Sequence, residues 1–213
     1  MEKLSEAQTD SLKALMNIWA WKASKALSQM TSQNIEISLS KLGLHPIEKI
    51  PTLVGNPSDV VATVYLKLDG QKDDLTFPTS ALLFMYSISS GAEIAAMMQG
   101  MDPSGAADKK ELDEIDVSAL KETGNILAGA CATTMSEFFK FKLLEGLPNY
   151  ACDMLQAVLD NVLAQIASKA EDTLYFDIVL SIRDHKISSS FLIVFDPLIR
   201  DQLIEKLSKP ELR

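Results

Sequence analysis

One predicted helix face combines a carboxylate with a carboxamide. Placed on an α-helix at about 100° per residue, residues 118–136 bring four positions within about 60° of arc: Ser118, Glu122, Asn125 and Gly129. A carboxamide accepts one hydrogen bond and donates another, so it can orient a water molecule, whereas a carboxylate can pair with a cation. The solvated face of an ordinary amphipathic helix has the same pattern, and spacing alone does not separate these two interpretations.

The segment that carries these residues occurs twice in the chain. At a shift of 108 residues, 10–28 and 118–136 are identical at six of 19 positions, where chance gives about one. The asparagine recurs in the same register, as Asn17 and Asn125. Because asparagine is a poor residue for a helix interior, its recurrence favours a functional interpretation of the polar face.

The stretches after each copy also correspond. In the first half we expect a strand over 34–40, a hairpin of 60–68 and 73–77 turning at Gly70, and a helix over 80–98. In the second half we expect a helix over 150–167, a hairpin of 173–182 and 188–195, and a helix over 197–206.

These elements predict an α/β fold. A single half has too few strands to bury its elements, so two pseudo-twofold-related α-β-β-β-α repeats should share one sheet with long helices packed on it. We expect one domain over residues 1–213, with repeats over about 5–100 and 111–208 and a linker at about 100–110.

Composition excludes several classes of function. The chain of 213 residues has 29 acidic and 20 basic residues, a net charge of −9, which disfavours nucleic acid as a partner. No apolar run approaches the ~20 residues of a membrane span, and the first residues lack an apolar signal segment, so we expect no membrane partner and a cytoplasmic location. No metal site is expected, because the two cysteines and two histidines are widely scattered and lack metal-ligand spacing. Cys131 is typical of a core position, and both His45 and His185 are typical of solvated loops.

Two further features favour function on the second copy. Small residues beside Asn125 are predicted to let another molecule approach: Gly124, Ala128 and Gly129. Pro148 follows after 22 intervening residues. Ser118, Glu122, Asn125 and Pro148 thereby fit the signature Asp/Ser-x3-Glu-x2-Asn-x22-Pro of the CheC/CheX/FliY family of chemotaxis phosphatases, which the chain resembles over about residues 5–205. Its length and duplication resemble CheC most.

The resemblance implies a protein aspartyl-phosphate phosphatase of a two-component system. Its substrate would be the phosphorylated CheY-like response regulator of chemotaxis, with one active site on a helix over about 113–138. Asn125 would position the attacking water, and Glu122 would pair with the receiver's lysine. Ser118 would make a lesser polar contact or support the helix start, and Pro148 would shape the backbone. The chain would need no cofactor of its own, because the receiver supplies Mg²⁺.

The first copy departs from the signature. Asp10 and Asn17 occupy matching positions, but Ala14 replaces the glutamate and Trp21 stands where the second copy has Gly129. We therefore expect the first site to be inactive. Trp21 either packs against a neighbouring loop or anchors a different protein, whereas Trp19 is expected in the core.

Two other functions remain open at this point. The chain resembles proteins that bind a CheD-like deamidase or sit in the flagellar switch, so a non-catalytic binding module is the alternative to a phosphatase. A vestigial signature on a soluble α/β protein is the third hypothesis. The intact second copy beside an eroded first copy favours the phosphatase.

Overall fold

The computed structural model describes residues 4–72, 75–166, 172–182 and 185–208. Its strands are β1 (Ile35–Pro46), β2 (Val60–Lys72), β3 (Leu75–Ser87), β4 (Lys142–Glu145), β5 (Asn149–Met154), β6 (Asp172–Ile182) and β7 (His185–Phe195). Its α-helices are α1 (Glu6–Thr31), α2 (Ile50–Val54), α3 (Ile88–Met98), α4 (Glu114–Phe139), α5 (Leu155–Ile166) and α6 (Pro197–Leu207). Two short 3-10 helices, η1 (Ile47–Lys49) and η2 (Pro103–Ala106), complete the described elements.

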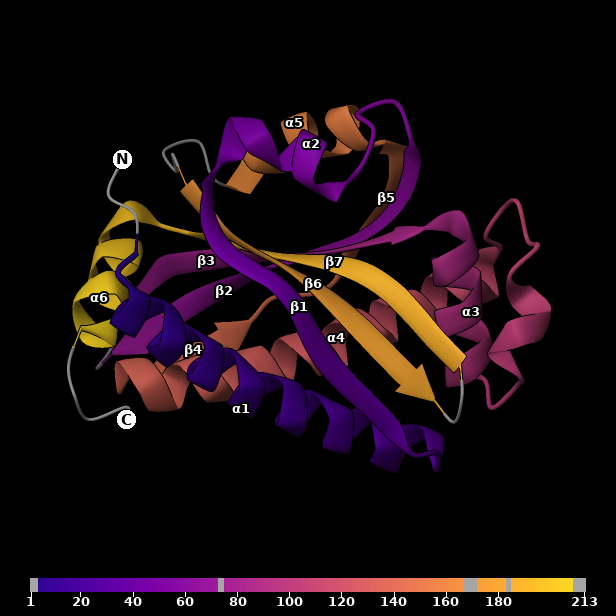
Figure 1. Ribbon diagram of the computed structural model, residues 1–213, viewed down its shortest axis with the longest axis horizontal. Coiled ribbons are helices and arrows are strands. Elements are labelled where there is room, and N and C mark those ends of the chain that lie inside the picture. Colours follow the sequence, from indigo (N-terminus) through magenta and orange to yellow (C-terminus); the bar gives the residue numbers. More distant parts are fainter. Residues whose placement is uncertain (1–3, 73–74, 167–171, 183–184, 209–213) are drawn as a thin grey trace.

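One antiparallel sheet organises the fold (Figure 1). Its strand order is β1-β6-β7-β3-β2-β4, and β5 also pairs with β2 on the β4 side. Each strand of the first half has an equivalent in the second half: β1 corresponds to β4, β2 to β6 and β3 to β7. Replacing every strand by its equivalent reverses the order, as a pseudo-twofold arrangement requires. The mixed α/β class and the shared sheet are therefore as predicted.

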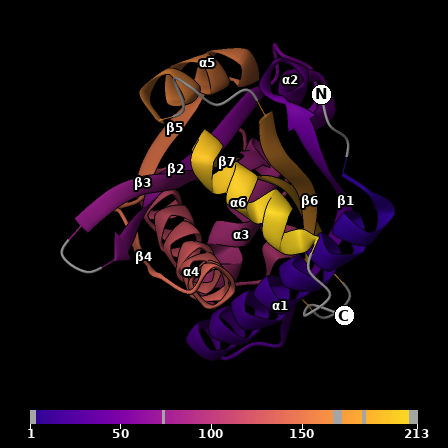
Figure 2. The same ribbon diagram turned by 90° about the vertical axis from the view of Figure 1, so that its left-hand side faces the viewer.

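Helices cover both faces of the sheet (Figure 2). The long helices α1 and α4 lie side by side on one face together with α6, and their apolar residues share one core with that face of the sheet. The short helices α2 and α5 cover a smaller core on the other face. Because α4 lies on the sheet with one side only, its other side is free to face a partner.

The two long helices correspond end to end. Each has 26 residues, and α4 begins 108 residues after α1. Both begin with a capping box, at Ser5 and Asp113, and both end at a residue with a left-handed backbone, Ser32 (φ 55°) and Lys140 (φ 65°). Equal caps and equal lengths place each polar stripe at the same distance from the start of its helix.

The predicted helix over 80–98 is wrong in its first half. Residues 75–87 form β3, and the helix begins only at Ile88. β3 pairs with β2 on one side and β7 on the other, and its alternate residues enter the two opposite cores. A strand buried on both faces has a continuous apolar run, which periodicity cannot distinguish from a buried helix.

Three smaller expectations also need correction. The helix predicted over 150–167 is α5, which starts five residues later than predicted because 149–154 form β5. Ala167 lies outside the described residues. Gly70 is not the hairpin turn but a strand residue opposite Phe77, and residues 73–74 lie outside the described part. The histidines are strand residues rather than loop residues: His45 lies half-buried in β1, and His185 opens β7 with Nε2 2.9 Å from Glu93 Oε1.

Candidate functional site

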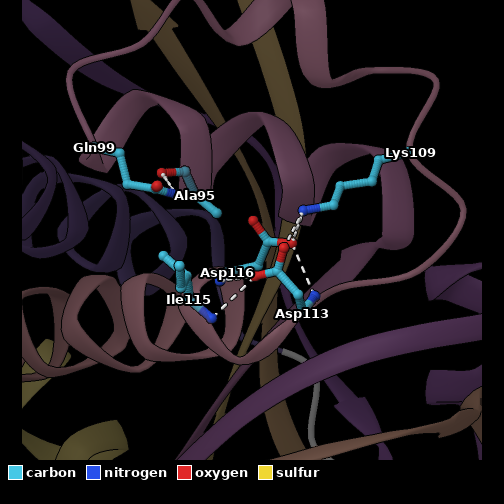
Figure 3. A network of polar contacts seen from close by, with 6 residues as sticks. All are labelled: Ala95, Gln99, Lys109, Asp113, Ile115 and Asp116. Carbon is cyan, nitrogen blue, oxygen red and sulfur yellow. Dashed lines mark hydrogen bonds and ion pairs between the residues drawn. The ribbon is translucent and has the colours of Figure 1, made fainter.

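A polar network fixes the start of α4 (Figure 3). The Asp113 carboxylate accepts hydrogen bonds from the backbone N–H groups of Ile115 and Asp116, and the buried Asp116 carboxylate accepts from that of Asp113. Lys109 pairs with both carboxylates. These hydrogen bonds raise the pKa of Lys109 and lower the pKa of Asp113. The network thus ties the helix start to the segment before it and fixes the first turns that follow.

The predicted polar stripe lies on the free side of α4. Ser118 and Glu122 are exposed, and Asn125 and Gly129 are half-exposed. The apolar residues predicted for the opposite side are all at most 1% exposed: Leu120, Leu127, Cys131 and Met135. Within the described ranges, the side chains of Ser118, Glu122 and Asn125 form no hydrogen bond or ion pair that would occupy them. A carboxylate and a carboxamide one turn apart are therefore both available to another molecule.

The small residues beside Asn125 serve two different purposes, which corrects part of the sequence interpretation. Gly124 and Ala128 are buried, so they face the core rather than a partner. A Cβ at Gly124 would lie 2.5 Å from Val64 Cγ1, so the glycine lets α4 approach β2 closely. Only Gly129 belongs to the surface stripe.

This difference predicts opposite effects of the same substitution. Gly124→Ala is expected to destabilise the protein by about 1–3 kcal/mol, because Val64 is fully buried and cannot move away. Gly129→Ala should leave stability unchanged or raise it by up to about 1 kcal/mol, since the nearest atom to its Cβ would be a carboxylate oxygen of Glu145, at 3.6 Å, and alanine favours the helix. Unfolding in urea measures both changes. A Gly124→Ala protein as stable as wild type would contradict the close approach.

The turn that holds Pro148 lies beside α4. The Ser136 hydroxyl accepts a hydrogen bond from the N–H of Leu143, and the Glu145 carboxylate approaches Gly129, so β4 follows the helix. Pro148 is half-buried and lies in the segment of chain that joins β4 to β5. Glu145 is exposed and brings a second carboxylate to the stripe, which no sequence pattern predicted. No local spacing indicates it, because it reaches the stripe only through the pairing of β4 with β2.

The matching face of α1 differs as the sequence predicts. Asp10 is exposed and lies 3.6 Å from Lys13, and Ala14 offers no carboxylate. Trp21 is 62% exposed, with Lys25 Nζ 5.4 Å from its ring centre, so it is not packed under a loop. The indole occupies the surface that remains open at Gly129 on α4.

Trp19 lies in the core, as expected. It is fully buried against Phe176 and Phe191, and its indole N–H donates a hydrogen bond of 3.1 Å to the carbonyl of Leu127. Trp19 and Leu127 hold equivalent positions, 108 residues apart, so the two helices meet near the axis that relates them. This contact fixes the position of α1 relative to α4.

The two cysteines have different environments, which predicts their reactivity. Cys131 is fully buried beneath the stripe, and burial raises the pKa of its thiol, whereas Cys152 is exposed. Because the thiolate is the reactive form, a disulfide reagent should modify one thiol of the folded protein quickly and the second only after unfolding. Cys152→Ser should abolish the fast phase. Two fast thiols in the wild-type protein would contradict the burial of Cys131.

The stripe is a surface and not a pocket. A cavity of about 670 Å³ lies elsewhere, and the described residues that line it include Asp59, Leu155 and Asp177 but none from α4. Within the described residues, no group of three or more histidine, cysteine or acidic side chains could hold a metal ion. None of the described helices is both long and apolar enough to cross a membrane. An open polar stripe of this kind suits a macromolecular partner better than a small molecule.

Comparison with known proteins identifies relatives of this chain. Residues 116–144 match the profile of the CheC-like family, a range that contains Ser118, Glu122 and Asn125. The chain is 25% identical to the CheY-P phosphatase CheC of Bacillus subtilis over 183 residues, 86% of this chain and 84% of that protein. It is 30% identical to the flagellar motor switch phosphatase FliY of Bacillus subtilis over 143 residues, 67% of this chain but 35% of that protein, so it spans about a third of FliY's length.

The fold has a counterpart among solved structures. The crystal structure of Thermotoga maritima FliY superposes with a TM-score of 0.73 at 20% identity, over 98% of this chain and 99% of that one. At this identity the likeness concerns the fold alone. Together, the profile, the relatives and the fold confirm the resemblance to the CheC/FliY family inferred from the sequence.

Proposed function

We propose that this chain is a phosphatase that removes the aspartyl phosphate from a CheY-like receiver through the stripe on α4. One observation carries the proposal: Glu122 and Asn125 lie one turn apart on an open face, with no partner among the described residues. Similarity to a protein named as a CheY-P phosphatase supports it. The matching face of α1 has Ala14 in place of the glutamate and Trp21 in place of the glycine, which supports a single working site on α4.

The chemistry needs little beyond positioning. In the receiver, the aspartyl phosphate is already activated, and the receiver's own Mg²⁺ and lysine balance the phosphoryl charge. The Asn125 carboxamide holds a water in line with the phosphorus atom by accepting one hydrogen bond and donating another. The bond from the water oxygen to phosphorus forms as the bond to the aspartate oxygen breaks. The water's protons leave with the inorganic phosphate, and the aspartate is released as a carboxylate.

Glu122 has a different role, because a carboxylate is repelled by a phosphoryl group. It pairs instead with the receiver's lysine and sets the position in which the receiver docks. Ser118 adds a polar contact at the start of the stripe, and Pro148 shapes the turn beside it. The chain holds no metal of its own in this mechanism.

The proposal is tested by timing phosphate loss from a phosphorylated receiver. The CheY-like receivers of the source organism are phosphorylated with a small phosphodonor, freed of it, and mixed with Mg²⁺ and increasing amounts of the protein. Release of inorganic phosphate should accelerate in proportion to the protein added. Loss at the receivers' own rates at every protein concentration would overturn the proposal.

A binding role is the second candidate, and one observation favours it. Trp21 is 62% exposed on α1, and large exposed aromatic side chains are common at protein interfaces. The partners to test are a CheD-like deamidase and the flagellar switch. The second is suggested by the relative FliY, which is named a flagellar motor switch phosphatase. Loss of capture by Trp21→Ala, with phosphatase activity intact, would assign α1 to binding.

A further inference from the structure

The turn of residues 146–148 lies alongside the polar stripe of α4. Glu145 approaches Gly129, and β5, which begins at Asn149, contacts α4. Burial raises the pKa of the Tyr150 hydroxyl, with smaller contributions from Cys152 and from Asp116 at the start of α4. The helix rises about 20 Å between Asp116 and Gly129, and an extended chain covers about 16 Å between Glu145 and Tyr150. The turn between them therefore runs beside the part of α4 that carries Glu122 and Asn125.

A β-bulge makes this turn project from the sheet edge. Leu68 of β2 pairs with Glu145, and Tyr65 pairs with Asn149, so two residues of β2 face the three residues 146–148. The extra residue bends the edge strand and redirects its side chains, as bulges beside functional sites commonly do. The N–H of Gly146 donates to the carbonyl of Lys67 (2.9 Å), and the Asn149 side chain donates to the carbonyl of Leu147 (3.2 Å).

Leu147 is presented to solvent by this fixed backbone. Its side chain is 86% exposed, more than any other large hydrophobic side chain in the described residues. A second apolar side chain, Ile115, is 64% exposed two turns before Glu122 and on the same face of α4. Single exposed hydrophobic residues are common on protein surfaces. These two differ because they border the unpartnered pair Glu122 and Asn125 on two sides.

We propose that Leu147 and Ile115 are apolar docking residues that bind the receiver protein beside the Glu122–Asn125 pair. This inference rests on the proposed function, and the receiver is the occupant because the two side chains are continuous with the surface that must meet its phosphoaspartate. Glu122 and Asn125 then act on the reacting group, while Leu147 and Ile115 hold the surrounding surface of the receiver. Burial of apolar area in this way increases affinity without changing the chemical step.

The test measures binding and turnover separately. Affinity is measured with a beryllofluoride-loaded receiver, and kcat and KM with the phosphorylated one. Leu147→Ser and Ile115→Ser should each raise Kd and KM by about 10-fold or more, since each removes one buried aliphatic side chain. Their kcat should stay within about twofold of wild type.

A matched control separates docking from general surface effects. Leu198 is 72% exposed on α6, so Leu198→Ser removes the same side chain from a different surface and should change neither Kd nor KM. All three variants should unfold like wild type, because surface substitutions change stability by about 0.5 kcal/mol or less. Unchanged Kd and KM in Leu147→Ser and Ile115→Ser, or an equal change in Leu198→Ser, would overturn the inference.

The outcome also distinguishes this inference from the proposed function. If wild type accelerates phosphate loss but Leu147→Ser binds the receiver normally, the docking role fails and the phosphatase stands. If wild type binds the loaded receiver without hydrolysing phosphate, the phosphatase fails and the Kd values still decide the docking role. If wild type binds no receiver at all, both are overturned.

Discussion

Asn125→Ala is expected to lower kcat for receiver dephosphorylation by about 10²–10³-fold, the usual cost of losing one positioned polar group at a reacting centre. The carboxamide makes no hydrogen bond within the described chain, so its removal leaves no buried group unsatisfied. KM should change little, because the contacts of Glu122 and the surrounding surface remain. The expected signature is a loss confined to kcat, with the unfolding midpoint unchanged.

Asn17→Ala is the matched control for this variant. Asn17 holds the equivalent exposed position on α1, where Ala14 replaces the glutamate. Its rate should equal that of wild type in the same assay of phosphate release. A comparable loss in both variants would show that α1 hydrolyses phosphate despite Ala14 and Trp21, and would contradict the single-site mechanism.

Trp19→Ala is expected to destabilise the protein by about 3–5 kcal/mol. The substitution empties the space between α1 and the rings of Phe176 and Phe191, which lie 5.6 and 5.0 Å from the indole. It also removes the hydrogen bond to the carbonyl of Leu127, which joins the two long helices. Because α4 packs beside α1, the loss should also loosen the support of the polar stripe.

Trp21→Ala tests whether this effect belongs to burial or to the residue type. Trp21 is 62% exposed, so its removal should change the free energy of unfolding by about 0.5 kcal/mol or less. Urea unfolding followed by circular dichroism measures both variants without relying on indole fluorescence. Equal destabilisation by the two substitutions would contradict the placement of Trp19 at the contact between the helices.

Local patterns predicted the long helices and the polar stripe well. The 3.6-residue period and the repeat at 108 residues predicted the opposite burial of Ser118 and Leu120. The closing helix at Pro197 and the second hairpin were also confirmed. In these elements, one buried face and one exposed face leave a clear periodic signal.

The failures have tertiary causes. β3 is apolar on both faces because it lies in the middle of the sheet, so its pattern resembled a helix. The role of Gly124 depends on Val64, which lies 60 residues away, and that of Glu145 on a strand pairing with β2. His185 opens a strand because β7 extends to meet β6, and it contacts Glu93 from a different half. No local spacing carries this information.

The working surface itself is tested most directly by amide hydrogen exchange of the protein, alone and with a beryllofluoride-loaded receiver. The single-site account predicts slower exchange over residues 118–129 and 146–147 in the complex, with no change over the equivalent residues 10–21. Slower exchange over 10–21 with none over 118–129 would place the receiver on α1 and contradict the account.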